Sequence, residues 1–141
     1  MSSSRCHLGE HSASTIITPH PGEAGRVLGS DSAHVEGDRP AAVRGLVAKL
    51  GGVAVLKGAR TLVAGSNALW ACHEGGPELA TAGSGDVLAG VIGALVGRGL
   101  SPMDAARVGV AIHGRAGHEA AEANGVVLAS DLPLAVARLL G

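Results

Sequence analysis

The 141-residue sequence is almost without aromatic side chains: Trp70 stands alone, and there is no Phe or Tyr. Proteins that bind single-stranded nucleic acid stack bases on aromatic rings, so this class is excluded. Charged residues make up only 16% of the chain, and eleven basic against twelve acidic side chains give a net charge of −1. This balance argues against a surface built to attract nucleic acid or an anionic membrane.

Cysteines and long apolar runs are equally scarce. Cys6 and Cys72 are the only cysteines and no CxxC spacing occurs, so neither a disulfide framework nor a cysteine-based zinc site is expected. Residues 1–14 lack the apolar core of a signal peptide. The longest apolar-leaning run, residues 87–97, is too short and glycine-rich to cross a bilayer. We therefore expect a soluble, cytoplasmic protein.

Hydrophobic residues and glycine are abundant instead, at 46% of the chain and 23 positions. A chain of this length is expected to form one domain with a modest core. Residues 1–14 are polar and without periodicity, which predicts an irregular lead-in to a structured part over residues 15–141.

The first half of the chain alternates short β-branched runs with helical patterns. Pro21 stands where a helix could begin and Gly29 where it could end, and the pair Gly51-Gly52 closes a second helical pattern. The predicted elements are a buried strand at 15–18, a helix at 21–28, a loop at 30–39, a helix at 40–50, a buried strand at 53–57, and a hairpin of strands at 61–65 and 68–72.

The sequence pattern of the second half predicts helices. A helix ending near Gly97 or Gly99 is predicted by an apolar stripe of Val87, Leu88, Val91, Ile92, Leu95 and Val96, and the small residues Gly90, Gly93 and Ala94 would allow a neighbour to approach closely. Ser101-Pro102 is a helix start signal, and this helix is expected to run to about Asn124. A last helix is predicted from Ser130. The whole pattern indicates an α/β protein without internal repeats.

A glycine-rich junction precedes the apolar stripe, in the sequence Gly83-Ser84-Gly85-Asp86. A loop that turns through Gly-x-Gly into a helix presents unpaired backbone N–H groups, which with the helix dipole form an anion site. Asp86 has two interpretations, either a stabilising acid in the first helical turn or a base that takes a hydroxyl proton beside bound phosphate. The junction lacks the Lys-Ser/Thr of a Walker A loop.

Two segments upstream carry further polar candidates. Lys57 and Gly58 follow a predicted strand, so the ammonium either meets ligand phosphates or is simply solvated, and the Thr61 hydroxyl is a second phosphate contact or a strand residue. In TPHPGE, residues 18–23, two prolines and a glycine hold His20 and Glu23 rigidly, for a ligand or as an ordinary strand-to-helix turn. The histidines at 73, 113 and 118 are expected to lie at the surface or between helices.

Taken in order, TPHPGE, VLKGART, ATAGSGDVLAG and GLSPMDAARVGVAIHG resemble the C-terminal half of the ADP-dependent NAD(P)H-hydrate dehydratases. These enzymes are similar in fold to the ribokinase-like carbohydrate and vitamin kinases. The resemblance covers residues 15–141. It implies the C-terminal half of a ribokinase-like three-layer α/β/α sandwich that binds nucleotide.

The resemblance also implies an activity and roles for individual residues. The family uses ADP, with Mg²⁺ expected beside it, to dehydrate the (S)-hydrate of NADH or NADPH, through phosphorylation of the hydrate hydroxyl and elimination of phosphate. His20 would contact the hydrated substrate, and Asp86 would lie at its hydroxyl as the base. Residues 76–85 would wrap the nucleotide. The residues implied to meet its phosphates are Lys57, Gly58, Ala59, Arg60, Thr61, Gly83, Ser84 and Gly85.

Two departures from the family pattern keep alternatives open. Gly75-Gly76-Pro77 replaces the usual Gly-Asn-Pro, so an expected side-chain amide is missing. The family's domain is also about twice as long, and its N-terminal half is not part of this sequence. The expectations are a fragment with a missing N-terminal half, a homo-oligomer, or a non-catalytic remnant that binds nucleotide or a partner. A small-alcohol kinase is a further reading, against which TPHPGE argues.

Overall fold

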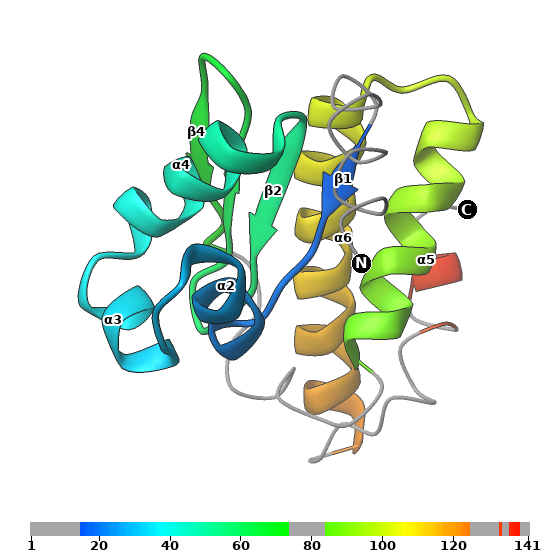
Figure 1. Ribbon diagram of the computed structural model, residues 1–141. Coiled ribbons are helices and arrows are strands. Elements are labelled where there is room, and N and C mark those ends of the chain that lie inside the picture. The colour runs from blue at the N-terminus through cyan, green and yellow to red at the C-terminus, as the bar shows by residue number, and fades with distance from the viewer. Residues whose placement is uncertain (1–14, 74–83, 125–132, 134–135, 139–141) are drawn as a thin grey trace. The chain divides into compact units, whose positions relative to one another are not determined.

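The computed structural model describes residues 15–73, 84–124, 133 and 136–138 (Figure 1). The chain forms two compact units, Met1–Ala71 and Cys72–Gly141. No helix within the described ranges is long and apolar enough to cross a membrane. The elements are β1 Ile16–Ile17, α2 Pro21–Leu28, α3 Ser32–Gly37, α4 Arg39–Leu50, β2 Val53–Leu56, β3 Leu62–Ala64, β4 Leu69–Ala71, α5 Ser84–Gly97 and α6 Pro102–Asn124.

The first unit is built on a four-stranded sheet of order β1-β2-β3-β4. β1 pairs with β2 in parallel, with Ile16 opposite Val53, while β2, β3 and β4 are antiparallel neighbours. The predicted hairpin is confirmed, since Gly65 donates to the Ala68 carbonyl at its turn, 2.9 Å away. β1 is half-buried rather than buried, and β2 is buried along its whole length.

Helix α2 begins and ends where the sequence predicted. His20 is the N-cap, and Pro21 occupies the first helical position, where its missing N–H costs nothing. Gly29 adopts φ 74°, which a side chain would disfavour, and its N–H donates to carbonyls of the last turn. Local chemistry is therefore enough to define this helix.

The loop predicted over 30–39 is wrong, because it contains α3 and the start of α4. Asp31 caps α3 by accepting from the His34 N–H at 2.8 Å, and Asp38 caps α4 by accepting from the Ala41 N–H at 3.1 Å. Val35 is the only buried residue of α3. A six-residue helix with a single buried apolar residue shows no hydrophobic periodicity, so the capping residues are its only sequence signal.

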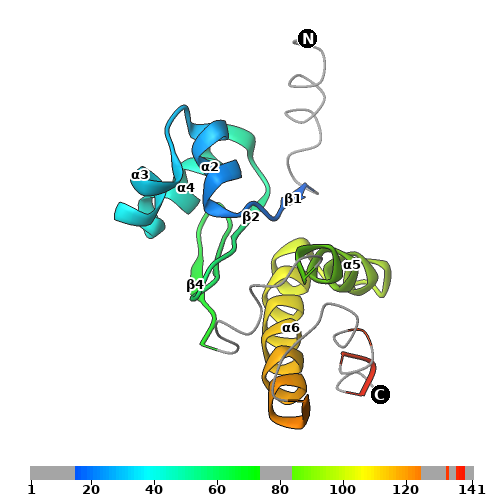
Figure 2. The same cartoon turned by 90° about the horizontal axis from the view of Figure 1, so that it is seen from below.

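One face of the sheet packs against the three helices of this unit, which gather on the same side (Figure 2). Leu46 of α4 and Leu56 of β2 are both fully buried there, and Val35 of α3 joins them. The core cluster consists of Ala24, Val35, Ala42, Val43, Leu46, Ala54, Leu56, Leu62 and Ala64. This core fixes the ends of β1 and β2 relative to α4.

The second unit places α5 and α6 side by side (Figures 1 and 2). Most of the predicted stripe is confirmed, with Leu88, Val91, Ile92 and Leu95 buried, but Val96 is 41% exposed and does not belong to it. The close approach predicted at Gly90 and Gly93 is not seen: a Cβ there would meet nothing within 4 Å. It occurs instead at Gly109 of α6, where a Cβ would lie 2.7 Å from Ile92.

Helix α6 starts at the predicted signal, because the Ser101 hydroxyl accepts from the Asp104 N–H at 3.2 Å. It ends at Asn124, as expected. Residues 133 and 136–138 are helical, in agreement with the last predicted helix, most of which lies outside the described residues together with residues 1–14.

Candidate functional site

Two of the predicted site segments meet at one edge of the sheet. Because β1 and β2 are parallel, their carboxyl ends lie at the same edge, where open α/β sheets bind ligands. β1 leads into His20 and β2 leads into Lys57. The Lys57 N–H donates to the Pro19 carbonyl at 2.9 Å, which joins the two segments directly.

His20 caps α2 through a reciprocal pair of hydrogen bonds. Its Nδ1 accepts from the Glu23 N–H at 3.2 Å, while Glu23 Oε1 accepts from the His20 N–H at 3.0 Å. Since Nδ1 is used as an acceptor, the neutral ring carries its proton on Nε2. The His20 side chain is 53% exposed, and its Nε2 lies 3.4 Å from Glu23 Oε1, so a ligand can reach the ring while the Nε2 atom faces the Glu23 carboxylate.

The Glu23 carboxylate is stabilised by its surroundings. The hydrogen bond from the His20 backbone lowers the pKa of the Glu23 carboxyl below its ordinary value, against the opposing effect of burial. Attraction by His20, Lys57 and Arg26 lowers this pKa further. The Glu23 carboxylate thus lies near the basic side chains of His20, Lys57 and Arg26, all within the first unit.

The segment after β2 is a short cationic loop. Gly58, Ala59 and Arg60 are exposed, while Lys57 and Thr61 are half-buried. The Thr61 hydroxyl donates to the Gly58 carbonyl, 3.5 Å away. Its proton is therefore used in a hydrogen bond within the loop. The loop presents one ammonium and one guanidinium, a composition suited to phosphate.

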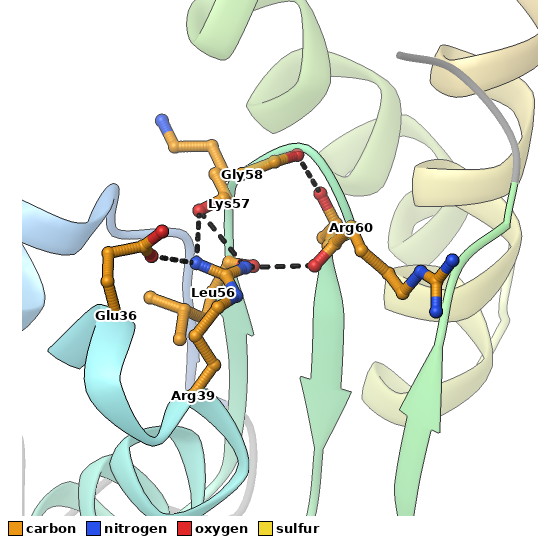
Figure 3. Close-up of polar contacts among 7 residues, drawn as sticks. Glu36, Arg39, Leu56, Lys57, Gly58 and Arg60 are labelled. Atoms are coloured by element: carbon orange, nitrogen blue, oxygen red, sulfur yellow. Dashed lines mark hydrogen bonds and ion pairs between the residues drawn. The ribbon is translucent and has the colours of Figure 1, made fainter. Parts of the chain in front are cut away.

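Arg39 organises this loop, and sequence reasoning missed it (Figure 3). Its guanidinium donates to the carbonyls of Leu56 at 3.2 Å, Lys57 at 3.4 Å and Arg60 at 2.9 Å. Glu36 pairs with it from α3. The one available signal is position: a cation in the first turn of a helix opposes the macrodipole, a cost of about 0.3–1 kcal/mol that calls for a compensating partner.

The glycine-rich junction lies in the second unit, at the start of α5. Ser84 is 4% exposed, and Asp86 is exposed in the first helical turn. The first N–H groups of a helix have no intrahelical partners, so an anion can bind them with the help of the dipole. Gly83 and residues 76–82 lie outside the described residues, and their assignment stays a prediction.

His113 of α6 is the second residue whose role was missed. It is 6% exposed, and its Nε2 lies 3.0 Å from the Ser84 carbonyl and 3.2 Å from the Ser84 hydroxyl. A carbonyl only accepts, so Nε2 must carry the proton and the hydroxyl oxygen shares it as a second acceptor. The Ser84 O–H is then directed away from His113. Of the other histidines, His73 and His118 lie at the surface, as expected.

The candidates therefore form two groups, each within its own unit. The first unit brings His20, Glu23 and Lys57 together, and the second places Ser84, Gly85 and Asp86 on one helical turn. Across the described residues, no three His, Cys, Asp or Glu side chains converge as a metal site. Cys72 is buried and not disulfide-bonded.

Comparison with known proteins shows what this chain is similar to. The chain is 50% identical over 120 residues to the bifunctional NAD(P)H-hydrate repair enzyme Nnr of Escherichia coli K12, covering 83% of this chain and 23% of that protein. It is 46% identical over 112 residues to the ADP-dependent (S)-NAD(P)H-hydrate dehydratase of Neisseria meningitidis, covering 79% and 38%. The chain thus spans well under half the length of these relatives.

A solved structure agrees. The ADP/ATP-dependent NAD(P)H-hydrate dehydratase of Bacillus subtilis, co-crystallised with ATP and Mg²⁺ and soaked with CoA, matches with a TM-score of 0.81 at 30% identity, covering 89% of this chain and 47% of that one. A neighbour from Enterococcus faecalis, at 26% identity, is a ribokinase-like superfamily protein, so the predicted ribokinase-like α/β fold is confirmed. Because the model of the NAD(P)H-hydrate dehydratase family matches residues 2–138, nearly the whole sequence, the chain belongs to that family.

Proposed function

We propose that this chain contributes to the ADP-dependent dehydration of (S)-NADH or (S)-NADPH hydrate, which restores the usable cofactor. The observation that carries the proposal is the 46% identity, over 112 residues, to a relative named for this reaction. The chain would form the C-terminal half of the ribokinase-like domain. The other half would come from further chain or from a second copy, and the cytoplasm is the proposed location.

The proposed nucleotide contacts are the cationic 57–61 loop and the start of α5, where backbone N–H groups are unpaired by the helix. Residues 57–61 offer Lys57 and Arg60 to the phosphates of ADP, and the start of α5 offers first-turn N–H groups with the Ser84 hydroxyl. The donor set fits Mg²⁺ held mainly by phosphate oxygens and water, since this ion commonly takes only one or two protein carboxylates. Asp86 is the exposed carboxylate of that turn.

Asp86 is the proposed base. The hydrate hydroxyl would attack the terminal phosphorus of ADP while its proton passes to the Asp86 carboxylate, forming a phosphate ester and releasing AMP. Loss of phosphate from that carbon and of a proton from the neighbouring carbon to water then restores the carbon–carbon double bond of the reduced nicotinamide. A positioned base of this kind contributes about 10²–10⁴-fold to rate. The placement of Asp86 beside an anion site supports the assignment.

His20 is the proposed substrate contact. Its Nδ1 is committed to the α2 cap and its Nε2 lies 3.4 Å from Glu23 Oε1, so the half-exposed ring would share its Nε2–H between Glu23 and the hydrated nicotinamide. The cap also fixes the ring at the end of β1, which supports a positioning rather than a proton-transfer role.

The test follows the absorbance of reduced nicotinamide after hydrated NADH, ADP and Mg²⁺ are mixed with the chain. Recovery that depends on both chain and ADP is the expected result. Asp86→Asn should reduce turnover by about 10²-fold or more and leave ADP affinity nearly unchanged. Asp104→Asn is the matched control, because Asp104 is also an acid in the first turn of a helix, α6.

Two results would contradict the proposal in different ways. Protection of the chain by ADP against heat, without any recovery of absorbance, would favour a non-catalytic nucleotide-binding remnant. Loss of ADP affinity in Asp86→Asn would make Asp86 a structural acid of the helix start.

A further inference from the structure

We propose that Arg39 is a positioning residue that turns the 57–61 loop into a phosphate-facing surface, an inference that rests on the proposed nucleotide binding. The first observation is the number and kind of its partners. One guanidinium reaches the carbonyls of Leu56, Lys57 and Arg60, which stand on both sides of the loop (Figure 3). A planar fork with several donors can hold such a set, whereas a single ammonium cannot.

The second observation concerns what these contacts do to the N–H groups. A trans peptide is planar, so the carbonyl of one residue and the N–H of the next point in opposite directions. The structure has no cis peptide among its described residues. Binding of the Lys57 and Arg60 carbonyls by Arg39 therefore directs the N–H groups of Gly58 and Thr61 to the opposite side of the loop.

The Leu56 carbonyl provides an internal check of this geometry. Arg39 binds it at 3.2 Å, and the next N–H, that of Lys57, should point away from the guanidinium. That N–H donates to Pro19 at 2.9 Å, on the TPHPGE segment. The same rule turns the Gly58 and Thr61 N–H groups away from the guanidinium, where they can serve as donors for an anion.

The third observation explains why residue 58 is glycine. A Cβ on Gly58 would lie 2.7 Å from one terminal nitrogen of Arg39, 2.8 Å from the other and 2.9 Å from the central carbon. The guanidinium thus occupies the space where a side chain would stand. Gly58 and Arg39 form a fitted pair.

Burial and charge favour a positioning role over direct ligand contact. The Arg39 side chain is 16% exposed, its guanidinium is engaged by carbonyls, and Glu36 offsets its charge. Exposed Arg60 and half-buried Lys57 remain the cations available to a ligand. Arg39 acts through the loop and does not touch the nucleotide.

The experiment compares Arg39→Ala and Arg39→Lys with Arg44→Ala, which removes an exposed arginine from the same helix. ADP affinity is measured by calorimetry, and the KM for ADP and kcat are measured where turnover is present. We expect about tenfold or larger loss of ADP affinity for both Arg39 variants, since small misplacements of binding groups are costly. KM should rise with kcat nearly unchanged, and Arg44→Ala should behave as the wild type.

A double-mutant cycle tests the fitted pair. Gly58→Ala should weaken ADP binding to a similar extent as Arg39→Ala, because both displace the guanidinium. In the Arg39→Ala background, Gly58→Ala should cost little more, a non-additivity expected for residues in contact. Full additivity would overturn the inference.

Amide hydrogen exchange of Gly58 and Thr61, followed by NMR without ligand, separates this inference from the proposed function. Faster exchange or shifted resonances in Arg39→Ala are expected even if the wild-type chain does not bind ADP. In that case the proposed function fails while the role of Arg39 in shaping the loop stands. Unchanged amides, or ADP affinity equal to the wild type in Arg39→Ala, would overturn the positioning role.

Discussion

The two units support their candidate binding segments with different kinds of contact. In the first unit, Gly25 lies against the backbone of Asp31, and the Arg39 guanidinium binds three carbonyls while its own side chain fills the space beside Gly58. In the second unit, Gly109 lies against the side chain of Ile92, and His113 reaches both the hydroxyl and the carbonyl of Ser84.

The difference determines what each unit can tolerate. Backbone atoms cannot change rotamer, so a contact with them moves only if the whole element moves. A side chain can turn aside at a small cost. Added volume should therefore be costly at Gly25, which meets backbone, and milder at Gly109, which meets a side chain.

The largest effect is expected for Gly25→Ala. The new Cβ would stand 2.7 Å from the carbonyl carbon of Asp31 and 2.8 Å from its Cα, in the turn that joins α2 to α3. Overpacking against an unyielding neighbour costs about 3 kcal/mol, the upper part of its usual range. Urea unfolding measures this loss. Gly37→Ala is the control, because a Cβ at Gly37 meets nothing within 4 Å. Equal stability of the two variants would break the comparison.

His113→Leu is expected to have the next largest effect, because His113 binds a backbone group, the Ser84 carbonyl, as well as the hydroxyl. Leucine leaves the buried Ser84 hydroxyl and carbonyl without the imidazole N–H, which costs about 1–3 kcal/mol. ADP affinity should fall as well, because the direction of the Ser84 O–H is no longer set. Thermal unfolding with and without ADP measures both effects.

His113→Gln is the conservative control for that substitution, since its side-chain amide can still donate. Partial recovery of both stability and ADP affinity in His113→Gln is the expected pattern. If His113→Leu lost stability but bound ADP as well as the wild type, His113 would be a packing residue only.

Gly109→Ala should be milder and should be relieved by a partner substitution. Its Cβ would lie 2.7 Å from Cγ1 of Ile92, but the Ile92 backbone is at ordinary distances of 3.5 and 3.6 Å. Rotation of one side chain costs about 0.5–1.5 kcal/mol, so a loss of that order is expected. Combined with Ile92→Ala, the substitution should be less harmful than the two separate losses added together.

A control for Gly109→Ala exists on the facing helix. Gly93→Ala meets nothing within 4 Å, and alanine favours a helix over glycine by about 0.8–1 kcal/mol, so this variant should be neutral or more stable. Destabilisation by Gly93→Ala to the same extent as by Gly109→Ala would contradict the packing described for α5 and α6.

Much of the fold could be predicted because its signals are local. Pro21 and Gly29 mark both ends of α2, and Ser101-Pro102 marks the start of α6, through chemistry that acts within a few residues. Helix α3 escaped because a single buried residue, Val35, gives no periodicity. Val96 was misassigned because apolar character fixes neither the edge of a stripe nor what covers it.

The residues of the candidate site also divide into those that the sequence could predict and those that it could not. His20, Lys57 and Asp86 stand in short motifs, so the sequence could propose them. Arg39 and His113 could not be proposed, because each acts on groups 17 to 29 residues away in the chain and the contact exists only after folding. The residues that position a site are thus harder to predict than those that face a ligand.

The smallest predicted effect is a pH dependence of stability at the capping box of α2. It compares the charged Glu23 carboxylate with a neutral acceptor at the same backbone N–H. The pKa of Glu23 is lowered in the folded chain, so its contribution to stability is present above the unfolded pKa and is lost as the pH falls through the folded value. Glu23→Gln keeps an acceptor for the His20 N–H but removes the charge. Wild type should be the more stable at neutral pH, and the two should converge in acid, as measured by urea unfolding. NMR titration of the Glu23 carboxyl gives the direction directly, and a midpoint above the ordinary value of 4.5 would contradict the assignment.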